Sequence, residues 1–227
     1  MTCALCVGLM GASTAAAQVG YPPTNSPYRD LEKTQELTLI GGIFKPRRDP
    51  ANVAPQGGPI VGLHYEWRAS GPAHLTGELA RISSDRRLIN PARTGAAREL
   101  GTENRPLYAG EAALGMSLTG ARSWHGVVPE VKGGVGFISD FRSKSDSGGF
   151  KFGTRFAISW GAGVRWVPGG SVQIRADWNN RLYTIAYPEE YYTAPSGGSA
   201  VVSSGQAKSF WTNNPALTLG ISYLFSR

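Results

Sequence analysis

From Gln35 onward the chain is built of segments in which apolar side chains alternate with small or polar ones. A β-strand points successive side chains to opposite faces, so period-two alternation predicts strands with one apolar and one polar face. The clearest example carries Phe156, Ile158 and Trp160 on one face and Ala157, Ser159 and Gly161 on the other. We find no convincing helical period in this part of the sequence. Eight strands are expected, over about 36–44, 59–68, 73–82, 106–119, 126–139, 152–166, 172–179 and 217–227.

The segments between these strands alternate in length along the chain. Short connections occupy about 69–72, 120–124 and 168–170, whereas polar segments such as 83–105 and 140–149 are long, and the last loop is expected to span 180–214. No run approaches the roughly 20 apolar residues that a membrane-spanning helix requires. If the chain spans a membrane, it must therefore form a closed barrel, because only helices and closed barrels satisfy every backbone polar group in lipid.

The last strand is unusually apolar for the end of a soluble chain. Leu217, Leu219, Ile221, Tyr223 and Phe225 form one face, and Thr218, Gly220 and Ser222 contribute to the other. In a barrel, such a strand closes the sheet beside the first strand. Considered alone, the segment also suits the closing strand of a soluble lipocalin-like barrel or sandwich.

Together these features resemble the family of small eight-stranded outer-membrane barrels, with an architecture similar to the OmpA transmembrane domain and OmpX. Long surface loops, short periplasmic turns, an even strand number and strands of about ten residues are typical of that group. The resemblance covers nearly all of the chain after residue 17 and is carried further by Gly161–Trp166 with the Pro168-Gly169-Gly170 turn. It implies an all-β fold: an eight-stranded antiparallel up-and-down transmembrane β-barrel over residues 35–227.

The resemblance also implies how the protein is assembled. Thr218, Gly220, Tyr223 and Phe225 resemble the C-terminal signal by which barrel-assembly machinery recognises such chains, although Ser226 and Arg227 follow the final aromatic residue. We therefore expect the assembly machinery to be a partner of this strand. The protein is expected to be a monomer in the bacterial outer membrane, in contact with its lipid and lipopolysaccharide.

The first 34 residues form two further segments. Residues 4–12 are apolar and small, and Ala15-Ala16-Ala17 precede Gln18, which predicts a signal peptide over 1–17. A start upstream of Met1 would account for the missing basic n-region. Residues 18–34 form a Pro-rich N-terminal segment, so the exported chain would begin near Gln18 and would contain neither Cys3 nor Cys6.

In a membrane barrel the polar faces of the strands point inward, where they would gather charges of both signs. An eight-stranded barrel is just wide enough for side chains to fill. A buried charge without a partner costs about 3–5 kcal/mol, so the inward charges should pair into a plug without a wide pore. A narrow or gated conduit lined by the same residues is the alternative. The predicted network comprises Glu66, Glu78, Glu111, Glu130, Lys132, Arg155, Arg165, Arg175 and Asp177.

Other chemistries find little support in the sequence. The net charge of +7 is scattered, which argues against a nucleic-acid partner and favours solvated loops or a polyanionic surface. His64 and His74 are expected to face inward near Glu66 and Glu78, but no nucleophile accompanies them, so neither a catalytic site nor an enzyme is predicted. No spacing typical of metal ligands or of a phosphate-binding loop is present, so no metal and no cofactor are expected.

The last loop is rich in aromatic residues, namely Tyr183, Tyr187, Tyr191 and Tyr192, with Phe210 and Trp211 beside them. Exposed aromatics suit glycan or protein binding, whereas the same residues could instead fold over the mouth of the barrel. The leading hypothesis is an outer-membrane barrel with a structural or surface-interaction role and a mostly closed interior. A small-solute channel is the main alternative. A lipid-modifying enzyme and a soluble lipocalin-like binder remain further possibilities.

Overall fold

The computed structural model describes residues 26–142, 144–146 and 148–226. The predicted signal peptide and residues 18–25 of the Pro-rich segment therefore lie outside the described residues. The elements are β1 (Tyr28–Asp30), β2 (Gln35–Phe44), β3 (Gly58–Ser70), β4 (Ala73–Ile82), β5 (Asp85–Ile89), η1 (Gly95–Arg98), β6 (Glu99–Asn104), β7 (Leu107–Ser117), β8 (Arg122–Trp124), β9 (Val127–Ser139), β10 (Thr154–Trp166), β11 (Val172–Ala186), η2 (Glu189–Tyr191) and β12 (Ser209–Phe225). Among these residues no helix is long and apolar enough to cross a membrane.

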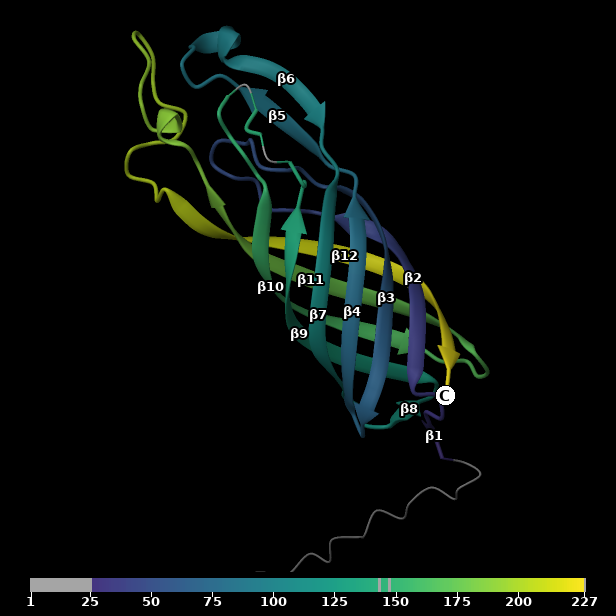
Figure 1. Ribbon diagram of the computed structural model, residues 1–227. Coiled ribbons are helices and arrows are strands. Elements are labelled where there is room, and N and C mark those ends of the chain that lie inside the picture. The colour runs from purple at the N-terminus through teal and green to yellow at the C-terminus, as the bar shows by residue number, and fades with distance from the viewer. Residues whose placement is uncertain (1–25, 143, 147, 227) are drawn as a thin grey trace, which may run out of the picture.

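Eight of the strands form a closed antiparallel ring in the order β2-β3-β4-β7-β9-β10-β11-β12 (Figure 1). The ring closes where β12 pairs with β2, with Phe225 opposite Gln35 and Ala216 opposite Phe44. Closure removes the free strand edges that an open sheet would expose. The predicted eight-stranded up-and-down barrel is thus confirmed.

The last hairpin extends well beyond its predicted limits. Residues 180–186 and 209–214 were expected in the last loop, but Asn180 pairs with Pro215 and Ala186 pairs with Ser209. Alternation continues through this region as Arg181, Tyr183 and Ile185, so the two strands keep pairing past Asn179. The last loop therefore spans only 187–208.

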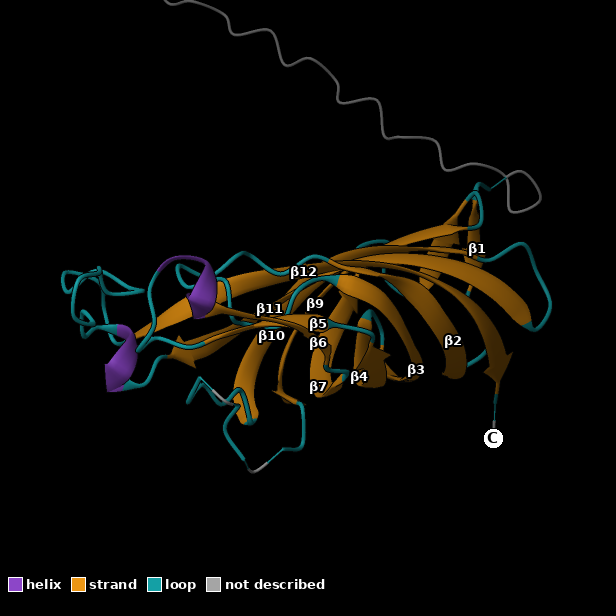
Figure 2. Cartoon of the chain, turned by 90° about the horizontal axis from the view of Figure 1, so that it is seen from above, coloured by secondary structure: helices purple, strands orange, loops and turns teal. Residues whose placement is uncertain are grey.

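Four further strands were not predicted. The segment 83–105, expected as a loop, contains the hairpin β5–β6, which projects above the ring together with η1. At the other end β1 pairs with β8, so the segment after Ser26 crosses the side that carries the short turns. The long loops, both helical turns and the β5–β6 hairpin gather at the end opposite the C-terminus (Figures 1 and 2).

The outer wall of the ring is apolar. Leu39, Leu79, Leu114 and Ile221 are each more than 60% exposed, and the alternate positions on the same strands face inward. Aromatic side chains on several strands also point outward, namely Tyr65, Trp67, Tyr108, Trp166, Trp178 and Tyr223. Trp178 lies midway along the lengthened β11, with its ring edge-on to Trp160 at a centroid distance of 4.9 Å. Phe152, expected on the outer wall, is buried instead, because β10 begins only at Thr154.

Candidate functional site

The half of the barrel interior nearest the termini is occupied by two arginines and the carboxylates around them. Arg165, on β10, reaches across the barrel, where its Nη1 lies 2.7 Å from Glu66 Oε1 and 3.2 Å from Glu36 Oε2. Its Nε lies 2.9 Å from Glu130 Oε2. All four side chains are at most 3% exposed. Each carboxylate therefore lies in a water-poor interior where only a cation can offset the cost of burying its charge.

Arg175, on β11, binds the same carboxylates from another direction. Its guanidinium lies 3.0 Å from Glu36 Oε1 through Nη1, 2.5 Å from Glu130 Oε1 through Nη2, and 2.7 Å from Asp177 Oδ2 through Nε. The side chain is fully buried. Planar guanidinium groups suit such sites because several N–H donors can meet several carboxylate oxygens at fixed angles. The two arginines thus join residues from β2, β3, β9, β10 and β11 into one network.

A second cluster lies higher in the barrel, around Glu78 on β4. Glu78 Oε1 lies 2.5 Å from Arg181 Nη2, and its Oε2 lies 3.8 Å from Lys132 Nζ and 3.5 Å from His64 Nδ1. Arg181 Nε also lies 3.3 Å from Glu111 Oε2. The Asn179 amide donates to both oxygens of Glu111 at 3.3 Å. With this cluster, the buried ion pairs extend toward the middle of the barrel.

Eight of the nine residues proposed for the network make ion pairs inside the barrel: Glu66, Glu78, Glu111, Glu130, Lys132, Arg165, Arg175 and Asp177. The ninth, Arg155, is only half-buried near the loop end of β10, where it donates to the Lys151 carbonyl at 3.2 Å. Among the described residues Arg155 makes no ion pair with the interior carboxylates, so the structure does not bring it into the network.

Two members of the network were missed. Glu36 lies at the start of β2, and Arg181 was assigned to the last loop. The alternation of inward positions contained the signal for both. Glu36 has the same parity as Thr38 and Ile40, and Arg181 continues the series of Gln173, Arg175, Asp177 and Asn179. Reading the inward positions of the expected strand 36–44 would have identified Glu36, and extending the strand 172–179 by two residues would have identified Arg181.

The interior nearest the loops is apolar, which the sequence analysis did not anticipate. Inward positions on several strands are buried there, and loop residues close over them. The Phe152 ring packs edge-on against Tyr183, with centroids 5.8 Å apart. The layer consists of Phe44, Ile60, Ala80, Ile82, Leu107, Ala109, Ile138, Phe152, Ala157, Tyr183, Ile185 and Ala216. The barrel is therefore filled by ion pairs in one half and by a hydrophobic core in the other.

The long loops are bound to one another into a single platform above this core. Asp49, in the β2–β3 loop, accepts a hydrogen bond from the Tyr187 hydroxyl at 2.5 Å. Buried Arg86, at the base of the β5–β6 hairpin, pairs with Asp146 and lies over the Phe150 ring, 5.0 Å from its centroid. Buried charges and rings at these junctions fix each loop relative to its neighbours. We refer to the loops 45–57, 83–106, 140–153 and 187–208 as the loop platform.

Three of the tyrosines that were expected in the last loop are buried at the barrel mouth. Tyr183, Tyr187 and Tyr191 are buried, and the rings of Tyr187 and Tyr191 are stacked with centroids 5.5 Å apart. Burial and the bond to Asp49 raise the pKa of Tyr187 well above its usual range, and burial also raises the pKa of Tyr191. Trp211 instead remains 53% exposed. Of the two hypotheses for these residues, packing over the mouth therefore holds for the three buried tyrosines.

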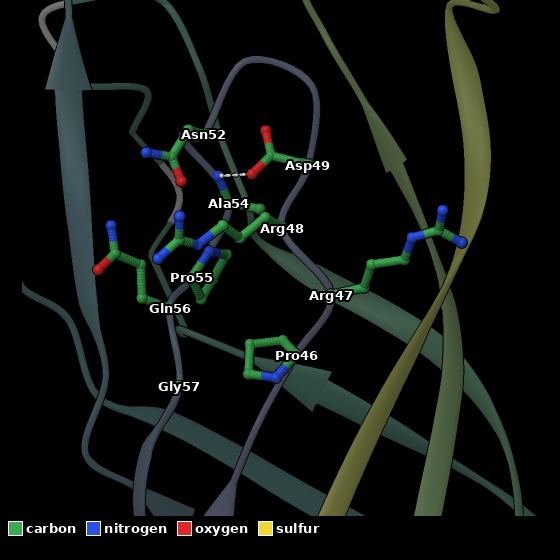
Figure 3. A pocket seen from close by; sticks show the side chains of 9 residues that line it. All are labelled: Pro46, Arg47, Arg48, Asp49, Asn52, Ala54, Pro55, Gln56 and Gly57. Atoms are coloured by element: carbon green, nitrogen blue, oxygen red, sulfur yellow. Dashed lines mark hydrogen bonds between the residues drawn. The ribbon is translucent and has the colours of Figure 1, made fainter.

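The β2–β3 loop carries two exposed arginines. Asp49 accepts hydrogen bonds from the backbone amides of Val53 and Ala54, at 3.2 and 3.0 Å, and so holds the loop in a tight turn (Figure 3). Arg47 points away from this turn toward β12 (Figure 3). Both arginines also border a pocket of about 380 Å³ that is lined by Trp211. Within the part of the chain that the structure describes, neither arginine makes an ion pair. This corner of the platform can receive an anion.

The residues of the proposed C-terminal signal all lie on β12. Thr218 is buried and points inward, as does Gly220, whereas Tyr223 points outward and is 59% exposed. The Tyr223 and Phe225 rings are stacked, with centroids 6.3 Å apart. The pattern thus presents a pair of aromatic rings on the outer wall at the end of the closing strand.

Comparison with known proteins supports the fold. No protein-family model and no curated protein sequence matches the chain. Among solved structures it is similar to the outer membrane protein OprG from Pseudomonas aeruginosa, with 11% identity and a TM-score of 0.50 over 86% of this chain and 98% of that one. Neisserial surface protein A is similar over 84% of this chain and 97% of that one, with 11% identity and a TM-score of 0.49. At this identity the likeness to OprG concerns the fold alone.

Proposed function

Because the chain has the fold of the small eight-stranded outer-membrane barrels, we propose that it is itself an outer-membrane protein with a structural or surface-interaction role. In this proposal the signal peptide at 1–17 directs export, and the barrel spans the outer membrane as a monomer. The loop platform then faces the cell exterior, and the short turns face the periplasm.

The observation that carries the proposal is the orientation of the two faces of the ring. Apolar side chains cover the outside, with Leu79 and Leu114 both 66% exposed, while the ion pairs lie inside. A soluble lipocalin-like barrel requires the opposite arrangement, since its apolar faces must surround a ligand. Lipid is the solvent that favours an apolar outer wall around a polar lumen.

The interior favours a closed barrel over a channel. Arg165 and Arg175 cross the lumen in the periplasmic half, and Phe152 and Tyr183 fill the half nearest the loops. Any solute would have to displace both layers. His64 and His74 each lie beside a glutamate, and the proposal assigns neither of them a catalytic role.

The loop platform is the part of the molecule that suits interaction at the cell surface. Its arginines Arg47 and Arg48 lie beside Trp211, close to where β12 leaves the barrel. Anionic headgroups of lipopolysaccharide are the partner that this combination of cations and an interfacial aromatic fits. On the periplasmic side, the aromatic pair Tyr223 and Phe225 on β12 suits recognition by the barrel-assembly machinery.

Cell fractionation combined with gel migration tests the proposal. We expect recovery in the outer membrane and a band that shifts on boiling, because a closed barrel resists detergent until it is heated. Protease added to intact cells should cut within the loops and not within the β3–β4 turn. Recovery in the soluble periplasm without a shift would overturn the proposal. Single-channel recording should show little current, and a large steady conductance would favour the channel instead.

A further inference from the structure

Three potential ligand atoms converge in the charged half of the barrel. Glu66 on β3, His74 on β4 and Glu130 on β9 each offer one ligand atom, and these atoms lie within 4.8 Å of one another. The candidate ligand atoms are Glu66 Oε2, His74 Nε2 and Glu130 Oε2, and the first two lie 3.9 Å apart. All three side chains are at most 3% exposed. Among the described residues none of these atoms has a hydrogen-bond partner of suitable geometry. Buried polar atoms that lack a partner are rare, which points to a species that they jointly bind.

The other oxygen of each carboxylate is held by an arginine. Arg165 Nη1 lies 2.7 Å from Glu66 Oε1, and Arg175 Nη2 lies 2.5 Å from Glu130 Oε1. The Oε2 atoms of the two glutamates are the ones that face the candidate site. Arg165 Nε also lies 2.9 Å from Glu130 Oε2, and Arg175 Nη1 lies 3.6 Å from Glu66 Oε2. Hydrogen bonds to the free oxygen of a ligating carboxylate are the usual outer-shell support of a metal site.

A glycine leaves space for the histidine. A Cβ added at Gly115, opposite His74 on β7, would lie 1.9 Å from His74 Nε2 and 2.4 Å from its Cδ2. Any larger residue at 115 would therefore push the imidazole away from the two carboxylates. The ring position is thus specified by the neighbouring strand as well as by β4.

The charges of the network leave room for a cation. Its ion pairs involve six carboxylates but only four lysine and arginine side chains: Glu36, Glu66, Glu78, Glu111, Glu130 and Asp177 against Lys132, Arg165, Arg175 and Arg181. With all six carboxylates ionised and His64 and His74 neutral, this set would carry an excess of two negative charges. A divalent cation beside Glu66 and Glu130 would remove the excess.

We propose that Glu66, His74 and Glu130 form a divalent transition-metal site inside the barrel, with zinc-type ions as the ligand class. One imidazole nitrogen and two carboxylate oxygens suit such ions, and a water molecule would complete a tetrahedral set. Ligands of a tetrahedral zinc ion lie roughly 3.4 Å apart, given bonds of about 2.1 Å. The three atoms therefore have to close by roughly 1 Å, which small rotations of the two glutamate side chains provide. The site joins β3, β4 and β9 and would act as a cross-link within the barrel.

Cobalt binding tests the site directly. The full chain, without a polyhistidine tag, is refolded into detergent in chelator-treated buffer and titrated with Co²⁺, and both visible absorption and bound Co²⁺ per chain are measured. We expect one Co²⁺ per chain with ligand-field bands, competed by Zn²⁺. His74→Gln should weaken binding by at least about tenfold. Gly115→Ala, which keeps all three ligands but displaces the ring, should weaken it as well.

His64→Gln is the matched control, because His64 is an equally buried histidine beside a glutamate on the adjacent strand. It should retain the wild-type affinity, and the shift in gel mobility on boiling shows that each variant is folded. Folded wild-type protein that binds no Co²⁺ would overturn the proposal. Binding that is unchanged in His74→Gln, or is lost equally in His64→Gln, would overturn it too.

Discussion

Arg165 on β10 donates to Glu66 on β3, with Nη1 and Oε1 2.7 Å apart, although these strands lie on opposite sides of the ring of eight. The contact spans the lumen. Together with Arg175, which reaches Glu36 and Glu130, it ties strands that share no backbone hydrogen bonds. Several of the charged side chains in the lumen thus form one network that connects opposite sides of the barrel. Its loss should lower the stability of the whole barrel.

The stability of the barrel should depend strongly on Arg175. Replacement by methionine leaves Asp177 without its main partner and removes a cation from Glu36 and Glu130. Breaking a buried ion pair on one side typically costs about 3–5 kcal/mol. We expect a loss of that order in urea unfolding from lipid vesicles, followed by tryptophan fluorescence. Arg122→Ala, which removes an exposed pair with Asp30, should cost at most about 1 kcal/mol.

The lipid-facing wall should not tolerate a charge at mid-height. Leu219 is 64% exposed and lies on β12 between Leu217 and Ile221. In Leu219→Arg we expect a destabilisation of about 2–4 kcal/mol, the cost typical of an arginine near the bilayer midplane. Ser204→Arg, in the last loop, is the control and should unfold like the wild type. Equal behaviour of the two variants would argue that this wall does not face lipid.

The hydrogen bond between Asp49 and Tyr187 should hold two loops of the platform together. Tyr187→Phe removes the hydroxyl that donates to Asp49 but keeps the ring stacked on Tyr191. A hydrogen bond to a charged group typically contributes about 1.5–3 kcal/mol. Limited proteolysis of the folded protein should therefore cut the last loop faster, by about tenfold or more, while the barrel itself stays intact. In a double variant with Asp49→Asn and Tyr187→Phe, the last loop should be cut no faster than in the single variant that is cut faster.

The same platform should loosen at alkaline pH. Burial and the bond to Asp49 raise the pKa of Tyr187, so the folded state holds this proton more tightly than the unfolded loop does. The contribution of protonated Tyr187 to the stability of the folded loop is complete below the unfolded tyrosine pKa of about 10, and it declines as the pH rises above that value. We expect the proteolysis rate of the last loop to rise above about pH 10. In Tyr187→Phe the rise in proteolysis rate should be smaller. An unchanged rise would show that other titrating groups cause it.

The alternation of inward and outward side chains along each strand predicted much of this architecture. Alternation placed Val61, Leu63 and Tyr65 on the outer wall and His64 and Glu66 inside, as the structure has them. It missed Arg181 because the seventh strand was ended at Asn179, and Glu36 was missed although it lies within the first expected strand. It also failed for Phe152, which lies in the loop just before β10 and turns inward.

The sequence by itself determined the number of strands in the ring, the alternation of long and short loops and which face of each of these strands is apolar, because a period of two is a local property of the chain. Only the tertiary structure decided which charges meet. Glu66, His74 and Glu130 come from three strands, and their separation in the sequence carries no metal-ligand spacing. Their meeting depends on closure of the ring and on the register of each strand pair. The apolar layer under the loops was likewise decided there, because it forms only when four loops fold over one end of the barrel.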